Sequence, residues 1–306
     1  MKAIQMTAYG NSSVLNITEV DKPTAKAGEV LIKIAATTVN PLDIKIRSGM
    51  MQQIMPVTFP YIPGLDVAGT VEAVGEGVSR IKKGDKVFAS SFGGTYAEYI
   101  CINEAVVCPM PGNVGFNEAA SLVTPLTTAY SLLVETAALQ PGQKLLVHGA
   151  AGAVGSVMVQ VAKAIGAYVI GTASARGVAL VTSLGADEAI DYTSQDFSQL
   201  VSGVDVVIDT VGGETQKKSF AVVKKGGKLL SIFMPPSPEL AAQYGITAQF
   251  VNSVPGLNKL LYGKKLVEEN KVKPHIAKTM TLQDAAAAQD LLAAGGLDGK
   301  IVLVVG

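Results

Sequence analysis

The sequence has no tryptophan, two cysteines and two histidines, and charged residues make up 16% of its 306 residues. Two cysteines, Cys101 and Cys108, are too few for a framework of two disulfides or for a cysteine-rich zinc site. Reduced thiols are usual in the cytosol, so we expect a cytoplasmic protein. Because average soluble chains contain roughly 25% charged residues, the low fraction predicts a large core or a dimer face, and we expect a homodimer.

An excess of charge of one sign is also missing, because 25 basic side chains balance 25 acidic ones. Nucleic acids and anionic membranes select clusters of lysine and arginine, so we expect no nucleic-acid partner. The longest uncharged runs, 119–134 and 145–162, are each interrupted by residues such as glycine, proline, threonine, histidine or glutamine, which argues against membrane insertion. The first residues also lack the apolar stretch, roughly seven or more residues long, of a secretory signal.

Short extended segments, separated by glycines and prolines, fill the first hundred residues. Glycines such as Gly64, Gly77 and Gly84 supply the positive φ angles that tight turns between strands need. This pattern predicts a coiled antiparallel β domain. The extended segments are 29–35, 67–74, 85–89 and 96–100.

After Pro111-Gly112 the pattern changes to helical stretches that alternate with short apolar runs, which predicts a parallel sheet buried on both faces. The helical stretches are 116–136 and 177–184, and the apolar runs are 144–147, 168–171, 204–209 and 228–231. A terminal apolar run at 300–305 needs a sheet to join, and we expect it to return to the first domain, with Pro255-Gly256 marking one crossover. We therefore predict a β domain of residues 1–122 and 266–306 and an α/β domain of residues 123–265.

A candidate nucleotide site lies at 144–155, Lys-Leu-Leu-Val-His-Gly-Ala-Ala-Gly-Ala-Val-Gly, which predicts a strand, a glycine turn and a helix start. The Rossmann template is Gly-x-Gly-x-x-Gly, and here Ala150 takes the first glycine position. We expect Gly152, Ala153, Val154 and Gly155 to bind a pyrophosphate through the helix amino terminus. The alternative is an ordinary tight turn between a strand and a helix.

The end of the second strand indicates the cofactor. An NAD site needs an acidic residue there for the ribose diol, but this chain has Ser174 and Arg176 and no carboxylate before Asp187. A hydroxyl and a guanidinium suit a 2′-phosphate, so we predict NADPH, with Tyr192 flanking the same phosphate. The alternative is that Ser174 only caps the following helix and that Arg176 is solvated.

Several motifs in order resemble the medium-chain dehydrogenase/reductase superfamily over essentially the whole chain, and within it the zinc-independent quinone oxidoreductases, most of all the alkenal and enone oxidoreductases. The motifs are Asn-Pro-Leu-Asp-Ile-Lys-Ile-Arg at 40–47, Ile-Pro-Gly-Leu-Asp-Val-Ala-Gly-Thr-Val at 62–71, Gly-Glu-Gly-Val at 75–78, Lys-Gly-Asp-Lys-Val at 83–87 and the glycine turn at 149–155. The resemblance implies a Rossmann domain with a doubly wound parallel sheet and a GroES-like coiled β-barrel catalytic domain.

The resemblance also implies roles for individual residues. Lys45 is the candidate donor to the oxygen that gains charge when hydride is transferred, Asn40 binds the substrate or the nicotinamide amide, and Thr128 contacts the nicotinamide ribose. Lys45 is equally well a solvated lysine, and Asn40 equally well a helix cap. Val211, Ile232 and Phe233 follow predicted strands, at the edge where open α/β sheets bind ligands.

The ligands of a catalytic zinc are missing. Zinc-dependent members of the superfamily have cysteine or histidine where this chain has Asn40 and Leu65, and Asp66 alone cannot complete a three-ligand site. We expect His148, which ends a buried strand, to be a packed and hydrogen-bonded residue. Asp43, Asp66 and Asp85 are expected to be turn or salt-bridge residues.

Without a metal, the nicotinamide supplies the hydride and the acceptor must already be electrophilic. We therefore predict NADPH-dependent reduction of a quinone or an α,β-unsaturated aldehyde or ketone, a small-molecule substrate. One alternative is an enoyl-thioester reductase, which would need a basic patch for a carrier phosphate. The only such cluster is Lys217, Lys218, Lys224 and Lys225, which we expect on the solvated face of one helix. Another alternative is an NADPH-binding protein without turnover.

Overall fold

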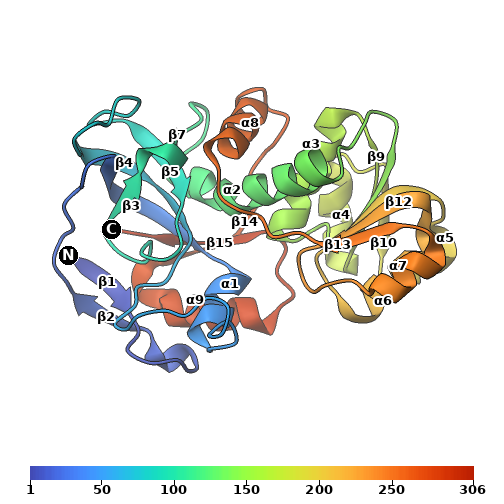
Figure 1. Cartoon of the computed structure of the whole chain (residues 1–306), viewed down its shortest axis with the longest axis horizontal. Helices are drawn as coiled ribbons and strands as arrows, with labels where there is room; N and C mark the ends of the chain where they lie inside the picture. Colours follow the sequence, from blue (N-terminus) through green and yellow to red (C-terminus); the bar gives the residue numbers. More distant parts are fainter. The chain divides into compact units, whose positions relative to one another are not determined.

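The computed structural model describes all 306 residues and divides into two compact units (Figure 1). Unit 1 comprises residues 1–124, 255–264 and 274–306, and unit 2 comprises residues 125–254 and 265–273. The crossings at 124/125, 254/255 and 273/274 each precede a proline. The sequence analysis drew the boundaries at 122/123 and 265/266, so it did not separate the segment 255–264 from the second unit.

Unit 1 is built on a seven-stranded, mainly antiparallel sheet whose path runs β14-β15-β3-β4-β5-β7, with β6 also paired to β3. The strands are β3 (Glu29–Val39), β4 (Asp66–Val74), β5 (Lys86–Ser90), β6 (Tyr99–Asn103), β7 (Val107–Pro109), β14 (Ile276–Thr281) and β15 (Lys300–Val304). A separate antiparallel pair is formed by β1 (Lys2–Gln5) and β2 (Asn16–Glu19). β15 pairs antiparallel with β3, which confirms the predicted return of the terminal strand.

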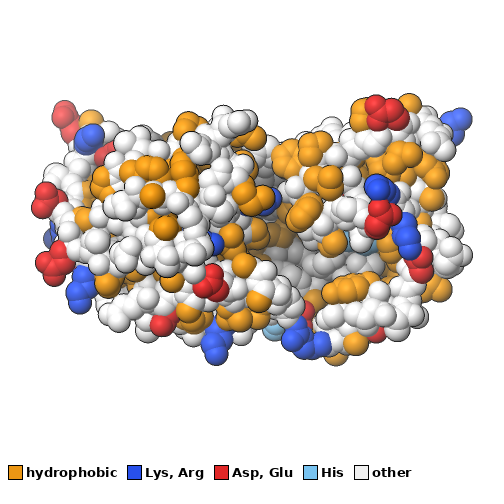
Figure 2. Space-filling model, turned by 90° about the horizontal axis from the view of Figure 1, so that it is seen from below, with side chains coloured by type: hydrophobic (Ala, Val, Ile, Leu, Met, Phe, Trp, Pro, Cys, Tyr) orange, Lys and Arg blue, Asp and Glu red, His pale blue; other side chains and the backbone are white.

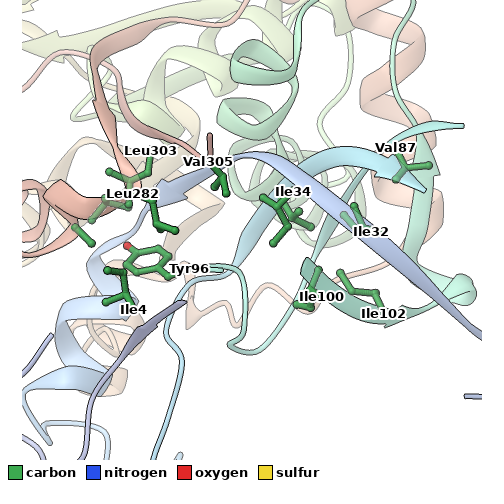
Figure 3. Packing of buried hydrophobic residues seen from close by; sticks show 14 of the residues in the cluster. Ile4, Ile32, Ile34, Val87, Tyr96, Ile100, Ile102, Leu282, Leu303 and Val305 are labelled. Carbon is green, nitrogen blue, oxygen red and sulfur yellow. The ribbon is translucent and has the colours of Figure 1, made fainter. Parts of the chain in front are cut away.

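Successive side chains of a strand point to opposite faces of the sheet, so one row of side chains from these strands lies in the core of unit 1. Ile32 and Ile34 of β3 and Leu303 of β15 are at most 1% exposed and contribute to one cluster with Tyr96 (Figure 3). The helices and short helical turns of this unit are α1 (Pro41–Arg47), α9 (Ala285–Ala294), η1 (Ser12–Val14), η2 (Glu104–Val106) and η4 (Leu282–Asp284). Elements α1 and α9 contact each other.

Unit 2 is a six-stranded parallel sheet in the order β10-β9-β8-β11-β12-β13. Counted from β8, this is the order 3-2-1-4-5-6 of dinucleotide-binding sheets, whose ligands bind where the order reverses, here beside β8 and β11. The strands are β8 (Lys144–His148), β9 (Tyr168–Ala173), β10 (Glu188–Asp191), β11 (Val204–Asp209), β12 (Val223–Ser231) and β13 (Thr247–Phe250). The helices are α3 (Ala153–Ile165), α4 (Ala175–Ser183), α5 (Phe197–Leu200), α6 (Gly213–Val222) and α7 (Pro238–Tyr244).

Two helices contain a boundary between the units. α2 (Phe116–Ala129) has Pro125 in its interior and continues into η3 (Tyr130–Thr136), a π-helical segment, and α8 (Leu257–Glu268) crosses at 264/265. Proline removes one backbone donor and so weakens the helical ladder where unit 2 begins. No helix of the structure combines the length and the apolar character that crossing a membrane requires.

Charged side chains are dispersed over the face seen in Figure 2, where basic and acidic groups lie among apolar and uncharged ones. Several lysines have acidic partners, among them Lys217 with Glu214 and Lys218 with Asp196. This distribution agrees with the balanced composition of the sequence.

Candidate functional site

The turn between β8 and α3 brings backbone into very close contact. Gly149 has a φ of 69°, and a Cβ atom there would lie 2.5 Å from the Oγ1 atom of Thr210. A Cβ atom on Gly155 would lie 2.2 Å from the carbonyl oxygen of Gly149. Both distances are too short for any side chain, so glycine is required at both positions. The helix therefore packs directly on the turn, as the sequence motif predicts for Gly155.

Ala150, the departure from the glycine motif, has space because of a glycine on the neighbouring strand. Ala150 is fully buried, and a Cβ atom on Gly171 of β9 would lie 2.8 Å from the Ala150 Cβ atom. The methyl group of Ala150 thus occupies room that Gly171 leaves empty. The motif has exchanged a glycine in the turn for a glycine in the adjacent strand.

Helix α3 begins without a side-chain cap. Its N-cap is Gly152, and the first helical residues are Ala153, Val154 and Gly155. The first N–H groups of a helix have no acceptor inside the helix, and no side chain caps them here. Together with the helix dipole they favour an anion at this point.

Three predicted phosphate residues follow the ends of two neighbouring strands in unit 2. Ser174 and Arg176 follow β9, and Tyr192 follows β10, with the Tyr192 N–H bonded to the carbonyl oxygen of Ala173 at 3.0 Å. Ser174 occupies the N-cap position of α4 but its hydroxyl makes no capping hydrogen bond. Tyr192 is 58% exposed and Arg176 is also exposed, so this corner of the sheet is accessible to solvent.

One carboxylate does lie at this corner, at the end of β10. Asp191 accepts hydrogen bonds from the backbone and hydroxyl of Thr193 and from the hydroxyl of Ser194. These bonds hold the pKa of Asp191 below its usual value, so the side chain is ionised and already engaged in its own turn. The hydroxyl of Ser174 and the guanidinium of Arg176 are the polar groups that follow β9 at this corner.

A buried carboxylate shapes the next two loops. Asp209, at the end of β11, accepts the N–H groups of Val211 and Gly212 with one oxygen, and bonds to Gln216 and Ser231 with the other. The carbonyl of Asp209 also accepts the N–H of Ile232. These bonds fix the loops that carry the remaining predicted contacts, and Val211 and Phe233 are 45% and 50% exposed.

His148 is a packed core residue, which confirms the sequence analysis. Its ring is fully buried between the hydroxyls of Thr172 and Ser219, at 3.0 and 2.9 Å. Ser219 donates its own proton to the carbonyl of Thr215, so the imidazole donates from Nε2 and accepts from Thr172 at Nδ1. Burial lowers the pKa of His148 to about 4, opposed by Asp209, and the ring is neutral at physiological pH.

The other predicted site residues lie in unit 1. Asn40 is 2% exposed and precedes α1, and its backbone N–H donates to Asp43 at 2.7 Å. The side-chain amide does not cap the helix. Its nitrogen donates to Asp66 at 3.0 Å and to Thr38 at 3.4 Å, and its oxygen accepts from Lys300 at 2.5 Å. Side chains of this unit thus engage both ends of the amide, while the substrate contact that the sequence analysis expected of Asn40 stays a prediction.

Asp66 joins several elements of unit 1. It is fully buried, accepts from Thr38 and from Thr124 at 2.5 Å each, and lies 3.3 Å from the ammonium of Lys300. Asp43 is also buried, and burial raises its pKa to about 7 although the Asn40 N–H opposes this. Asp85 accepts the N–H of Lys82 in a turn. Asp66 and Asp85 are thus the salt-bridge and turn residues that the sequence predicts, whereas Asp43 lies in α1 and accepts the N–H of the residue that caps this helix.

Lys45 is partly exposed on α1, and its carbonyl accepts the N–H of Met51 and the hydroxyl of Ser48. Thr128 is 5% exposed in α2, four residues after Thr124. Lys45 and Asn40 belong to unit 1, whereas Thr128 and the glycine-turn residues belong to unit 2. The sequence analysis did not find Lys300, because no motif contains it and 260 residues separate it from Asn40.

Neither a metal cluster nor a phosphate-binding lysine patch is found. No group of three histidine, cysteine, aspartate or glutamate side chains is placed to hold a metal ion. The expectation that four lysines share one helix is wrong, since Lys217 and Lys218 lie on α6 but Lys224 and Lys225 lie on β12. Lys224 pairs with Asp205, so three of the four have acidic partners.

Comparisons with known proteins agree with this arrangement. Residues 26–112 match the alcohol dehydrogenase GroES-like domain, and residues 184–303 match the zinc-binding dehydrogenase family. The chain is 32% identical to quinone oxidoreductase of Mus musculus, over all of this chain and 98% of the relative. It is 37% identical to 2-methylene-furan-3-one reductase of Solanum lycopersicum, over 99% of this chain and 79% of the relative.

Solved structures are similar over their full length. Quinone oxidoreductase from Coxiella burnetii superposes with a TM-score of 0.90 at 32% identity and covers all of this chain, which in turn covers 99% of it. Quinone oxidoreductase of Escherichia coli, solved with NADPH, has a TM-score of 0.90 at 27% identity, covering 99% of this chain and all of that one.

Proposed function

The chain belongs to the quinone oxidoreductase branch of the medium-chain dehydrogenase/reductase superfamily and is an oxidoreductase, and on this premise we propose that it reduces quinones or α,β-unsaturated carbonyl compounds with NADPH and without a metal ion. The observation that carries the proposal is the corner at the ends of β9 and β10. There the Ser174 hydroxyl makes no capping hydrogen bond, and Arg176 is exposed. The nearby carboxylate of Asp191 accepts hydrogen bonds within its own turn.

The residues of unit 2 fit a dinucleotide phosphate. Gly155 lets α3 pack directly on the glycine turn, and the first turn of α3, which begins after Gly152, offers N–H groups that no side chain caps. The guanidinium of Arg176 suits a 2′-phosphate, which distinguishes NADPH from NADH. The Escherichia coli relative was solved with NADPH, which supports the same cofactor here.

The residues of unit 1 do not fit a catalytic zinc. Asn40 stands where zinc-dependent members have a ligand, and its oxygen already accepts from the ammonium of Lys300. Asp66 is neutralised by the same ammonium. A metal ion would have to displace a buried cation, so the proposed reaction uses none.

Lys45 is the proposed donor for the reaction. When bound, NADPH would supply a hydride, and the oxygen of a conjugated carbonyl or a quinone would gain negative charge in that reaction. The ammonium of Lys45 stabilises that charge from α1, and solvent then protonates the product. The name of the Solanum lycopersicum relative describes a ketone next to a methylene group, an acceptor of this type. Thr128, Val211, Ile232 and Phe233 are assigned to the nicotinamide half of the cofactor.

An enoyl-thioester reductase is less well supported. Its carrier phosphate would need free basic side chains, but Lys217, Lys218 and Lys224 have acidic partners. Those ion pairs are exposed and individually weak, so a phosphate could compete for them, yet the lysines gather on no single helix.

We also propose a cytoplasmic homodimer. Neither Cys101 nor Cys108 is in a disulfide, as in a reducing compartment. β13 is an edge strand of the unit 2 sheet, and Phe250 at its end is 44% exposed, a surface suited to a second copy of the chain. The molar mass in solution, measured by light scattering, tests the dimer, and a monomer at micromolar concentration contradicts it.

The first experiment follows the absorbance of NADPH and, separately, NADH at a wavelength near 340 nm after addition of a short enone, a 2-alkenal or a 1,4-quinone, with and without a chelator. We expect oxidation of NADPH in preference to NADH, unchanged by the chelator. Oxidation with an enoyl thioester alone favours the alternative substrate. Binding of NADPH without oxidation by any acceptor contradicts the proposed activity.

The matched variant is Lys45→Met. Removing one donor to a developing oxyanion typically lowers kcat by about 100-fold to 1000-fold. The control is Lys278→Met on β14, an exposed lysine of the same unit. Equal kcat values for the two variants would remove Lys45 from the mechanism.

A further inference from the structure

A buried lysine in unit 1 has no role in the proposed function so far. Lys300 is the first residue of β15 and is 4% exposed, although lysine is rarely buried unless it is paired. Its ammonium lies 2.5 Å from the Asn40 oxygen and 3.3 Å from an oxygen of Asp66. The side chain is therefore held by one neutral acceptor and one charged acceptor.

This pair of contacts fixes the orientation of the Asn40 amide. The oxygen faces the ammonium of Lys300, and the nitrogen faces the carboxylate of Asp66. A rotation of the amide by half a turn would bring its N–H groups against the ammonium and its oxygen against the carboxylate. Both new contacts would be repulsive, so the charged pair permits one orientation only.

The Asn40 backbone in turn fixes the first turn of α1. Its carbonyl accepts the N–H of Asp43, and its N–H donates to the carboxylate of Asp43. Pro41 follows and restricts the backbone further. Lys45 extends from the same seven-residue helix. A change in the Asn40 side chain is thus transmitted directly to the helix that carries the proposed donor.

The same pair also holds the end of α2 that belongs to unit 1. The second oxygen of Asp66 accepts the hydroxyl of Thr124, the last residue before the crossing at 124/125. One buried ion pair therefore connects β15, β4, the start of α1 and the middle of α2.

We propose that Lys300 is a positioning residue for the reaction: its ammonium orients the Asn40 amide and so sets the start of α1, from which Lys45 reaches the acceptor oxygen. This inference rests on the proposed function. The competing interpretation is that the ion pair only stabilises unit 1, because buried pairs can often be replaced by apolar groups without loss of fold.

The test uses Lys300→Met together with Asp66→Asn. Lys300→Met alone leaves the Asp66 carboxylate buried without its cation, so a lower melting temperature is expected. The double variant removes both charges, and the amide of an asparagine at position 66 can still accept from one threonine hydroxyl and donate to the other. We expect it to fold and to bind NADPH within about twofold of wild type, with kcat lowered by about tenfold or more. Lys278→Met on the adjacent β14 is the matched control.

Rescue and coupling separate positioning from stability. Lys300→Arg keeps a cation with several donors and should return kcat to within about threefold of wild type. Asn40→Ala should lower kcat as far as the double variant does, and adding it to the double variant should cost little more, because both act through one amide. A wild-type kcat in the double variant would overturn the proposal. So would a kcat in the triple variant as low as independent effects of Asn40→Ala and of the double variant would give. If the double variant does not fold, wild-type kcat in Asn40→Ala overturns it as well.

A measurement that needs no enzymatic turnover distinguishes the positioning role of Lys300 from the proposed reductase activity. Amide hydrogen exchange of residues 40–47 should be faster in the double variant than in wild type, while exchange of β3 stays unchanged. Absence of NADPH oxidation by the wild-type protein would refute the proposed function and leave this exchange result to decide the orientation of α1. Equal exchange in both proteins would refute the role of Lys300 even in an active enzyme.

Discussion

At the residue scale, Arg176 is the residue proposed to distinguish two cofactors that differ by one phosphate. Arg176→Ala removes the guanidinium proposed for the 2′-phosphate, so the KM for NADPH should rise by about tenfold or more while the KM for NADH changes little. Steady-state kinetics with both cofactors measures this. Arg80→Ala, in a loop of unit 1, is the control. A parallel rise for both cofactors would show that Arg176 serves the fold and not the phosphate.

Also at the residue scale, a pair of substitutions can test whether Ala150 in the turn depends on the space that Gly171 leaves on β9. Gly171→Ala places a methyl group 2.8 Å from the Ala150 Cβ atom and 2.6 Å from a methyl of Val181. We expect a loss of about 1–3 kcal/mol in the free energy of unfolding. Adding Ala150→Gly should recover part of it, because one of the two contacts is relieved. Chemical denaturation measures both, with Gly112→Ala as control, since a Cβ atom there meets no atom within 4 Å.

The sequence predicted the residues whose contacts lie within one local motif. It did not predict the residues whose contacts join strands that are far apart in the sequence. The contacts of the glycine turn are made within a few residues of each other, so the spacing of the glycines in the sequence predicts the close packing at Gly155. Gly171 and Lys300 acquire their importance only when β9 lies beside the turn and β15 lies beside β3. The engaged amide of Asn40 has the same origin, because its partners come from three separate strands.

At the element scale, β15 is buried on both faces from Lys300 to Leu303, and only its last residue is partly exposed. Leu303 is fully buried in the unit 1 core, whereas the neighbouring Val304 is partly exposed. Leu303→Ala should cost about 2–5 kcal/mol of unfolding free energy, and Val304→Ala about 1 kcal/mol or less. Denaturant titration compares the two. Similar losses would contradict the partial exposure of Val304 at the end of β15.

The elements themselves followed from periodicity where the chain repeats a simple pattern. The run 204–209 coincides with β11, and the helical stretch 116–136 coincides with α2 together with η3. Periodicity did not reveal that Pro125 and the π-helical turn interrupt the second of these. The exposed strands β2 and β13 were not predicted either, because edge strands carry few buried apolar residues.

At the scale of the whole molecule, the two units should respond to acid in opposite directions. His148 in unit 2 has a folded pKa of about 4 against an ordinary 6.5, so unit 2 loses stability as the pH falls from 6.5 towards 4, by roughly 3 kcal/mol. Asp43 in unit 1 has a folded pKa of about 7 against 3.8, so unit 1 gains stability as the pH falls from 7 towards 3.8, by roughly 4 kcal/mol.

Hydrogen exchange, corrected for the intrinsic effect of pH, measures the two units separately. Asp43→Asn should flatten the response of unit 1 alone, and His148→Gln that of unit 2 alone. Stability changes of the same sign in both units would contradict this prediction and would place the titrating groups elsewhere.

The pairing of β3 with β15 also sets the order in which a growing chain can complete its parts on the ribosome. All of unit 2 is synthesised before β14 and β15, although unit 1 contains the first residues made. Until β15 emerges, the segment of β3 from Ala36 to Val39 has no partner on that side and exposes an open strand edge. The middle of the chain is therefore expected to fold first, and the nascent amino-terminal half depends on chaperones for longer than its position in the chain suggests.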